Sequence, residues 1–360
     1  MEMVFRWFGE NNDHVSLKHI KQIPDVKGIV WSLHHMAAGE KWSLAQIEEV
    51  QQQVLPHGLH IEVVESVNIH EDIKLGLPTR DQYIENYIET IKELAKVGVK
   101  VICYNFMPVF DWIRTDLQKP LEDGSTALFY EKSLVEGANP SDLVARVLKD
   151  DSFTMPGWEP ERLEHLQQVI KAYESVDEEQ LFANLQYFLE RVIPVAEQHD
   201  IKLAIHPDDP PWSVFGLPRI VTSEENLGRI LRLVDSPANG LTFCSGSLGA
   251  NPANDLPSIV RKYGERIHFA HVRNLKRFDN GDFVETAHKM SHGSLDMVGI
   301  MEAFHEIGFT GYMRPDHGRD IWDEVGRPGY GLYDRALGIM YLHGIWDALD
   351  RKDGQHGTTA

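Results

Sequence analysis

The sequence predicts a single α/β domain, a (β/α)8 TIM barrel with a long insertion after the fourth strand. Eight short apolar runs are spaced along its 360 residues, and stretches with apolar residues at helical spacing separate them. The runs are nearly continuous in apolar residues, which is typical of parallel strands buried on both faces. Eight strands with helices between them, in a chain of this length, indicate a closed barrel.

The helices expected between the strands have clear boundary signals. Residues 42–58, 80–98 and 294–308 carry apolar side chains at helical spacing. Ser43 offers a side-chain oxygen to the first free amides, and Gly58, Gly98 and Gly308 stand where left-handed caps end helices. In chain order, the expected strands are VFRWFG near Phe5, GIVWSL from Gly28, HIEVVESV from His60, KVICYNFM from Lys100, KLAIHP from Lys202, LTFCSG from Leu241, IHFAHV from Ile267 and GYMRP from Gly311.

The segment from about residue 111 to 200 is much longer than one connection between a barrel strand and the next. Loops at the carboxyl ends of the strands build the sites of such barrels, so we expect the insertion to cover the mouth and to contribute substrate or subunit contacts. Residues 1–350 are expected to form one catalytic domain. The end, 351–360, lacks apolar periodicity and is expected to be disordered.

The composition narrows the class of partner. With 55 acidic and 35 basic residues the net charge is -20, which disfavours nucleic acid and anionic membranes and favours a small-molecule ligand. The first residues are too short an apolar run for a signal-peptide core, and no run of about 18 apolar residues occurs. Two cysteines are too few for a disulfide framework, so we expect a cytoplasmic protein.

Four potential metal ligands, His206, Cys244, His271 and Asp316, stand at the ends of the last four expected strands, at intervals of 38, 27 and 45 residues. Consecutive strands of a barrel are neighbours, so their carboxyl ends converge. Any one of these residues could be an ordinary packing or turn residue. The set predicts a mononuclear metal site at the mouth.

The types of the four residues limit which metal ions the site could bind. Within IHFAHV, His271 can point into the mouth while His268 faces the surrounding helices, and Gly246 leaves room beside Cys244. Two neutral imidazoles, a thiolate and a carboxylate would neutralise a divalent ion. The sulfur ligand disfavours Mg²⁺ and Ca²⁺ and leaves Fe²⁺, Mn²⁺, Co²⁺ or Zn²⁺.

Further polar residues at the strand ends suit a polyhydroxylated acid. Arg6, Arg273 and Arg314 could bind a carboxylate, and Asn105 follows the fourth strand.

Acid or base residues are expected after the last strand. The run RPDHGRDIWDEVGRPGYGLYDRALG brings His317, Tyr330 and Tyr333 close to the mouth. A tyrosine near a cation can take part in proton transfer, but the sequence does not choose between Tyr330 and Tyr333.

Six motifs in matching order, FRWFG, AIHPDDPP, TFCSGSLGANP, HFAHVRN, RPDHGR and GYGLYDRALG, resemble the mannonate dehydratases of hexuronate breakdown. The resemblance runs from the first strand to about residue 350. It implies a xylose isomerase-like barrel, a hydro-lyase that converts D-mannonate to 2-keto-3-deoxy-D-gluconate, and dependence on Fe²⁺ or Mn²⁺. Carried over residue by residue, the metal positions of the family fall on His206, Cys244, His271 and Asp316.

This reaction removes the C2 proton and the C3 hydroxyl, and the resulting enol then becomes a keto acid. We assign proton transfer to Tyr330, with His317 and His35 as further candidates, and carboxylate binding to the nearby arginines. Two alternatives stay open: a metal-dependent sugar isomerase or epimerase on the same barrel, and a non-catalytic barrel that binds sugar acids. A homodimer or larger homo-oligomer, paired through the insertion, is also expected.

Overall fold

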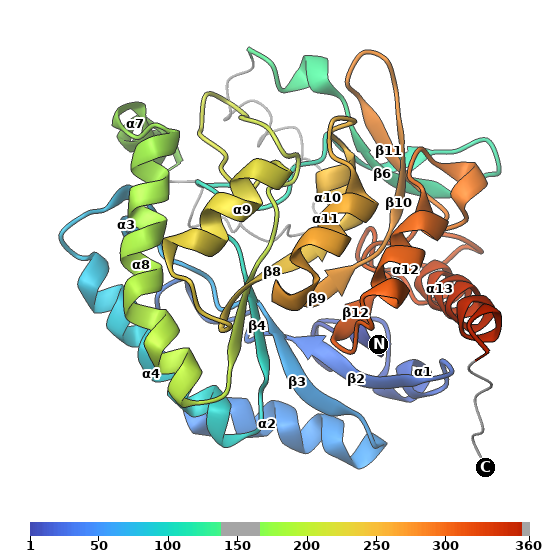
Figure 1. Ribbon diagram of the computed structural model, residues 1–360, viewed down its shortest axis with the longest axis horizontal. Coiled ribbons are helices and arrows are strands. Elements are labelled where there is room, and N and C mark those ends of the chain that lie inside the picture. The colour runs from blue at the N-terminus through green and yellow to red at the C-terminus, as the bar shows by residue number, and fades with distance from the viewer. Residues whose placement is uncertain (138–165, 355–360) are drawn as a thin grey trace.

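The computed structural model describes residues 1–137 and 166–354 and contains a closed barrel of eight parallel strands (Figure 1). The barrel closes where β1 pairs with β12, with Glu2 opposite Tyr312 and Met3 opposite Met313. All eight expected strands are present, so the predicted fold class is confirmed. In their order around the barrel the strands are β1 (Glu2–Arg6), β12 (Tyr312–Arg314), β9 (Ile267–His271), β8 (Asn239–Cys244), β7 (Lys202–Ile205), β4 (Val101–Tyr104), β3 (His60–Glu65) and β2 (Val26–Trp31).

The helices surround the strands and follow the predicted boundary signals. Ser43 caps α2 by accepting a hydrogen bond from the backbone N–H of Gln46, and Gly58, Gly98 and Gly308 all have positive φ angles. These caps are confirmed. The described helices are α1 (Leu17–Lys21), α2 (Leu44–Val54), α3 (Glu71–Leu75), α4 (Arg80–Lys96), α7 (Leu166–Ala172), α8 (Glu178–Gln198), α9 (Glu224–Leu233), α10 (Ser245–Gly249), α11 (Leu256–Tyr263), α12 (Met297–Glu306) and α13 (Tyr333–Lys352).

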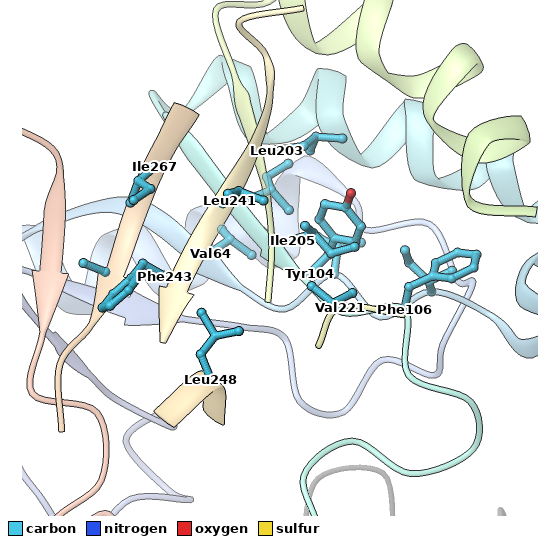
Figure 2. Close-up of a cluster of buried hydrophobic side chains, with 14 of the residues drawn as sticks. Val64, Tyr104, Phe106, Leu203, Ile205, Val221, Leu241, Phe243, Leu248 and Ile267 are labelled. Atoms are coloured by element: carbon cyan, nitrogen blue, oxygen red, sulfur yellow. The ribbon is translucent and has the colours of Figure 1, made fainter. Parts of the chain in front are cut away.

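Side chains of the barrel strands form two hydrophobic cores. The inner core fills the barrel mostly with small or branched side chains, as the narrow interior of eight strands requires. The outer core lies between the strands and the helices, and Figure 2 shows part of it, with Leu203 and Ile205 of β7 beside Leu241 of β8. The inner core consists of Val4, Val30, Val63, Val101, Cys103, Ala204 and Phe269.

A second sheet lies beside the barrel, and the sequence did not predict it as a unit. Its antiparallel order is β10 (Asn274–Arg277), β11 (Phe283–Thr286), β6 (Thr126–Tyr130) and β5 (Asp116–Pro120). The hairpin β5–β6 lies in the predicted insertion, whereas β10–β11 follows β9 and forms a second excursion from the barrel. In Figure 1, β6, β10 and β11 lie together to one side of the barrel strands.

The predicted insertion and the predicted tail each include residues that the structure does not describe. Residues 138–165 of the insertion and 355–360 of the expected tail are not described. Within the described part, α8 packs against α4 and β7, so residues 178–198 belong to the helical layer of the barrel. Helix α13 continues through Lys352, two residues into the expected tail. Among the described helices, none combines the length and apolar character that a membrane span needs.

Candidate metal centre and active site

A cavity of about 290 Å³ opens at the mouth, the end of the barrel where the strands have their carboxyl ends. Most of the residues predicted from the sequence contribute to it. Cys244 and His271 do not line it, but both are fully buried and contact Asp316, which does. The predicted residues that line the cavity are Arg6, Asn105, His206, Arg273, Arg314, Asp316, His317 and Tyr330.

Two histidines face each other at the mouth, one of which, His206, lines the cavity. Nε2 of His206, directly after β7, lies 3.1 Å from Nδ1 of His271, the last residue of β9. Nδ1 of His206 lies 2.7 Å from the carbonyl oxygen of Pro207. That oxygen only accepts hydrogen bonds, so the proton of His206 sits on Nδ1, and Nε2 presents a lone pair to His271.

Cys244 and Asp316 complete the predicted set. One ligand atom each from His206, Cys244 and His271 lies within 4.8 Å of the other two. Asp316 joins them through Oδ2, 3.5 Å from Sγ of Cys244, and through Oδ1, 3.6 Å from Nδ1 of His271. The structure therefore brings together all four residues predicted from the ends of four separate strands.

The donor geometry fits a divalent ion. Two imidazole nitrogens that each lie about 2.0–2.1 Å from a common ion are about 3 Å apart, which matches the separation of His206 and His271. Asp316 is held ionised, as a ligand must be: burial raises the pKa of its carboxyl, but the guanidinium groups of Arg273 and Arg314 outweigh burial and hold the pKa well below its usual range.

Other donor groups fit less well. Glu65, Cys103 and His271 also bring ligand atoms together, but burial raises the pKa of the Cys103 thiol well above its usual value, so this sulfur stays protonated. A further group, Glu2, His60 and Glu62, lies at the strand starts, at the opposite end of the barrel from the mouth.

The three predicted arginines differ in how many hydrogen bonds and ion pairs they make with carboxylates of the protein itself. Arg273 donates to Asp316 and, at 2.8 Å, to Asp209, while Arg314 donates to Glu65 at 3.0 Å and to Asp316 at 2.8 Å.

Arg6 is engaged much less. It is 7% exposed, and within the described residues its Nη1 has no hydrogen-bond partner. Its guanidinium lies over the ring of Phe8, 4.7 Å from the centroid. Arg6 is therefore the guanidinium best placed to receive an anion from solvent.

Tyr330 and His317 form a hydrogen-bonded pair beside the cavity. The Tyr330 hydroxyl lies 2.9 Å from Nε2 of His317, and Tyr330 is buried. Burial raises the pKa of Tyr330 to about 12, so the hydroxyl keeps its proton at neutral pH. Tyr333, which the sequence left as an alternative, begins α13 and is 42% exposed.

His35 requires a correction. It is exposed and is not among the residues that line the cavity, whereas its neighbour His34 is. The chain turns here, with the N–H of Met36 bonded to the carbonyl oxygen of Leu33. Asn105 does line the cavity, held by Asp111 at 3.1 Å and by the N–H of Met107 at 3.2 Å.

The sequence missed several charged residues that brace the site. Arg114 makes a bidentate ion pair with Asp209, at 2.8 and 3.0 Å, and donates to Glu285 at 2.7 Å. Asn280 and Gly281 separate two short strand-like runs, which is a recognised hairpin signal and could have revealed β11, the strand that carries Glu285. No comparable signal marks Arg114.

The closed barrel of eight parallel strands and its helical layer define a (β/α)8 TIM barrel with its cavity at the mouth. A solved xylose isomerase domain protein from Planctomyces limnophilus shares this fold, with a TM-score of 0.57 at 12% identity over 97% of this chain and 99% of that one. The comparisons also identify the family. The model of the family described as D-mannonate dehydratase (UxuA) matches residues 1–356, and the chain belongs to that family.

Full-length relatives agree with this assignment. Mannonate dehydratase 1 of Halalkalibacterium halodurans is 65% identical over 360 residues, which is all of both chains. The crystal structure of mannonate dehydratase from Streptococcus suis serotype 2 superimposes with a TM-score of 0.89 at 42% identity, covering 100% of this chain and 99% of that one. The resemblance noted in the sequence is confirmed, and these matches support a dehydratase over the two alternatives.

Proposed function

We propose that this protein is a metal-dependent hydro-lyase that converts D-mannonate to 2-keto-3-deoxy-D-gluconate in hexuronate breakdown. The observation that carries the proposal is the Tyr330–His317 pair beside the four metal-donor residues, in a chain that matches the D-mannonate dehydratase family over residues 1–356. At about 290 Å³ the cavity is at the small end of ligand pockets, which suits a six-carbon acid.

Substrate binding is assigned to Arg6 and Asn105, and the two other predicted arginines, Arg273 and Arg314, support the metal site. Arg6 receives the substrate carboxylate, because its buried Nη1 gains a charged acceptor there. Asn105 and the carboxylates of the cavity wall offer hydrogen bonds to the sugar hydroxyls. Arg273 and Arg314 keep Asp316 ionised and in place.

Proton transfer is assigned to the Tyr330–His317 pair. Nε2 of His317 takes the C2 proton, the electron pair of the C2–H bond forms the C2–C3 double bond, and the C3–O bond breaks. Tyr330 gives its proton to the departing hydroxyl, which leaves as water, and His317 then returns the C2 proton to the Tyr330 oxygen. The enol that remains tautomerises to the keto acid, and both residues regain their starting states.

His206, Cys244, His271 and Asp316 would hold the metal, for which we propose Mn²⁺ or Fe²⁺. When bound, such an ion neutralises negative charge that develops on substrate oxygens. The two buried free thiols support the expected cytoplasmic location. We also propose a homodimer or larger homo-oligomer, which the exposed apolar side chains Tyr333, Leu337 and Met340 on α13 support.

The test is product formation from D-mannonate by metal-stripped protein, before and after Mn²⁺, Fe²⁺, Zn²⁺ or Mg²⁺ is added back singly. We expect a keto-deoxy acid lighter than the substrate by one water, formed with Mn²⁺ or Fe²⁺ and absent without metal. Conversion between an aldose and a ketose without loss of water would instead identify an isomerase. Binding of mannonate with no product under any ion would identify a non-catalytic barrel.

A further inference from the structure

Glu285 contacts the histidine of the proton-transfer pair but comes from outside the barrel. It lies on β11 of the second sheet, and both of its carboxylate oxygens are 3.0 Å from Nδ1 of His317. Glu285 is 2% exposed. On the other side of the imidazole, Nε2 meets the Tyr330 hydroxyl, so the three side chains form one continuous chain of hydrogen bonds.

The direction of these hydrogen bonds follows from the charge of Glu285. Burial raises its pKa, but the charges around it, first that of the Arg273 guanidinium and also that of Arg114, outweigh burial and lower the pKa to about 2, so the carboxylate only accepts. Nδ1 of His317 must therefore carry a proton and donate it to Glu285. In the neutral ring Nε2 is then a lone pair, which accepts the hydrogen bond that Tyr330 donates.

Arg114 fixes the carboxylate itself. Its Nη2 and Nε donate to Oε1 of Glu285 at 2.7 and 3.2 Å, and its other contacts hold Asp209 at the mouth. Arg114 precedes β5, and Glu285 lies on β11, so each of the two excursions from the barrel supplies one partner. Pairing of β11 with β6 brings the two excursions together.

We propose that Glu285 is a positioning residue for the dehydration, which holds the ring of His317 and its proton on Nδ1 so that Nε2 faces Tyr330. This inference rests on the proposed function. It gives the second sheet a role in catalysis: the sheet delivers the carboxylate that orients the reacting histidine. An analogous carboxylate orients the histidine of serine protease triads, where the amide replacement leaves the geometry in place but stabilises the wrong tautomer.

The variant Glu285→Gln tests this role because Arg114 dictates how the new amide lies. Arginine only donates, so the amide oxygen must take the place of Oε1, and the amide NH2 must take the place of Oε2. That NH2 group then lies 3.0 Å from Nδ1 of His317, the same distance as the amide oxygen, so a proton on Nδ1 faces a second donor. This contact disfavours the proton on Nδ1 and favours the tautomer with the proton on Nε2, where it faces the Tyr330 hydroxyl.

The kinetic result expected for Glu285→Gln is a fall in kcat of about 10²-fold or more, with the KM for D-mannonate and the bound metal per chain unchanged. Glu285→Asp keeps an acceptor-only group, and its kcat should lie between those of the wild type and Glu285→Gln. The matched control is Asp282→Asn, which removes a carboxylate from the same hairpin. Asp282 accepts from the N–H of Lys132 at 2.8 Å and so also joins the two excursions, and we expect wild-type kcat from this variant.

A spectroscopic readout separates this inference from the proposed function. In zinc-loaded protein with ¹⁵N-labelled histidine, the His317 signals are those missing from a His317→Asn variant. We expect a proton on Nδ1 in the wild type and on Nε2 in Glu285→Gln. A wild type without dehydratase activity would refute the proposed function, while these tautomers would still be measurable. An unchanged kcat in Glu285→Gln, or a wild-type His317 protonated on Nε2, would refute the positioning role.

Discussion

Ser247 lies against the sulfur of Cys244 through two groups: its backbone N–H is 3.4 Å from Sγ and its hydroxyl is 3.1 Å from Sγ. Cys244 ends β8 and caps the short helix α10, so these donors come from the first turn that follows it. A sulfur that binds a metal can also accept hydrogen bonds from N–H and O–H groups around it, so both donors are compatible with ligation by Cys244. Within residues 1–137 and 166–354, Cys103 has one hydrogen-bond donor at its sulfur, the Thr242 hydroxyl at 3.2 Å in the inner core.

This difference between the two cysteines predicts that only one of two matched replacements lowers the metal content. Cys244→Ser should lower the metal bound per chain, because a serine hydroxyl is a harder and less acidic ligand than a thiolate. Cys103→Ser should leave metal content near that of the wild type. Elemental analysis after dialysis against Mn²⁺ or Zn²⁺ measures both. Loss of metal from Cys103→Ser alone would place the ion with Glu65, Cys103 and His271 instead.

Removal of the Tyr330 hydroxyl should greatly slow turnover without loss of the bound metal. In Tyr330→Phe we expect kcat to fall by about 10²–10⁴-fold, because the acid that protonates the leaving hydroxyl is lost, while bound metal stays constant. The control is Tyr333→Phe, since Tyr333 is exposed at the start of α13 and should be dispensable. A Tyr330→Phe variant with a normal rate would remove this residue from the mechanism.

Replacement of Arg6 should weaken substrate binding more than it affects the fold. Arg6→Gln should raise the KM for D-mannonate by about 10- to 100-fold, as expected for loss of a hydrogen bond between charged groups. The midpoint of thermal unfolding should change little, because the replacement removes a buried charge whose Nη1 has no hydrogen-bond partner within the described residues, and this offsets the lost contact with Phe8. Arg229→Gln, which removes a surface guanidinium paired with Glu179, serves as the control. An unchanged KM in Arg6→Gln would show that another group binds the carboxylate.

Replacement of Asp320 by asparagine should stabilise the protein, by an amount that depends on pH. Burial, and then the charge of Glu324, raise its pKa to about 7 from the usual 3.8. The native state therefore keeps a proton that the unfolded state loses, and stability falls as pH rises from about 4 to 7. Asp320→Asn removes this penalty, so its free energy of unfolding in urea should exceed that of the wild type at pH 8 and match it near pH 4. Asp323→Asn, at an exposed position nearby, should show no such pH dependence; an equal gain for Asp320→Asn at both pH values would contradict the assignment.

Local patterns in the sequence were sufficient to predict the barrel and the convergence of the four candidate metal ligands. A short apolar run predicts each strand. Helix caps such as Ser43 and Gly58 depend on a few neighbouring residues. A closed barrel then brings the strand ends together, so placing His206 and Cys244 at strand ends is enough to place them near each other.

Tertiary structure alone decided which polar residues act together around these donors. Glu285 reaches His317 only because β11 pairs with β6, a strand about 150 residues away in the chain, and nothing near Arg114 in sequence reveals its partners. His34 lines the cavity while the adjacent His35 does not, and burial distinguishes Tyr330 from the exposed Tyr333. Pairing between distant strands and the burial of side chains depend on the whole folded chain, whereas strand periodicity and helix caps depend on adjacent residues.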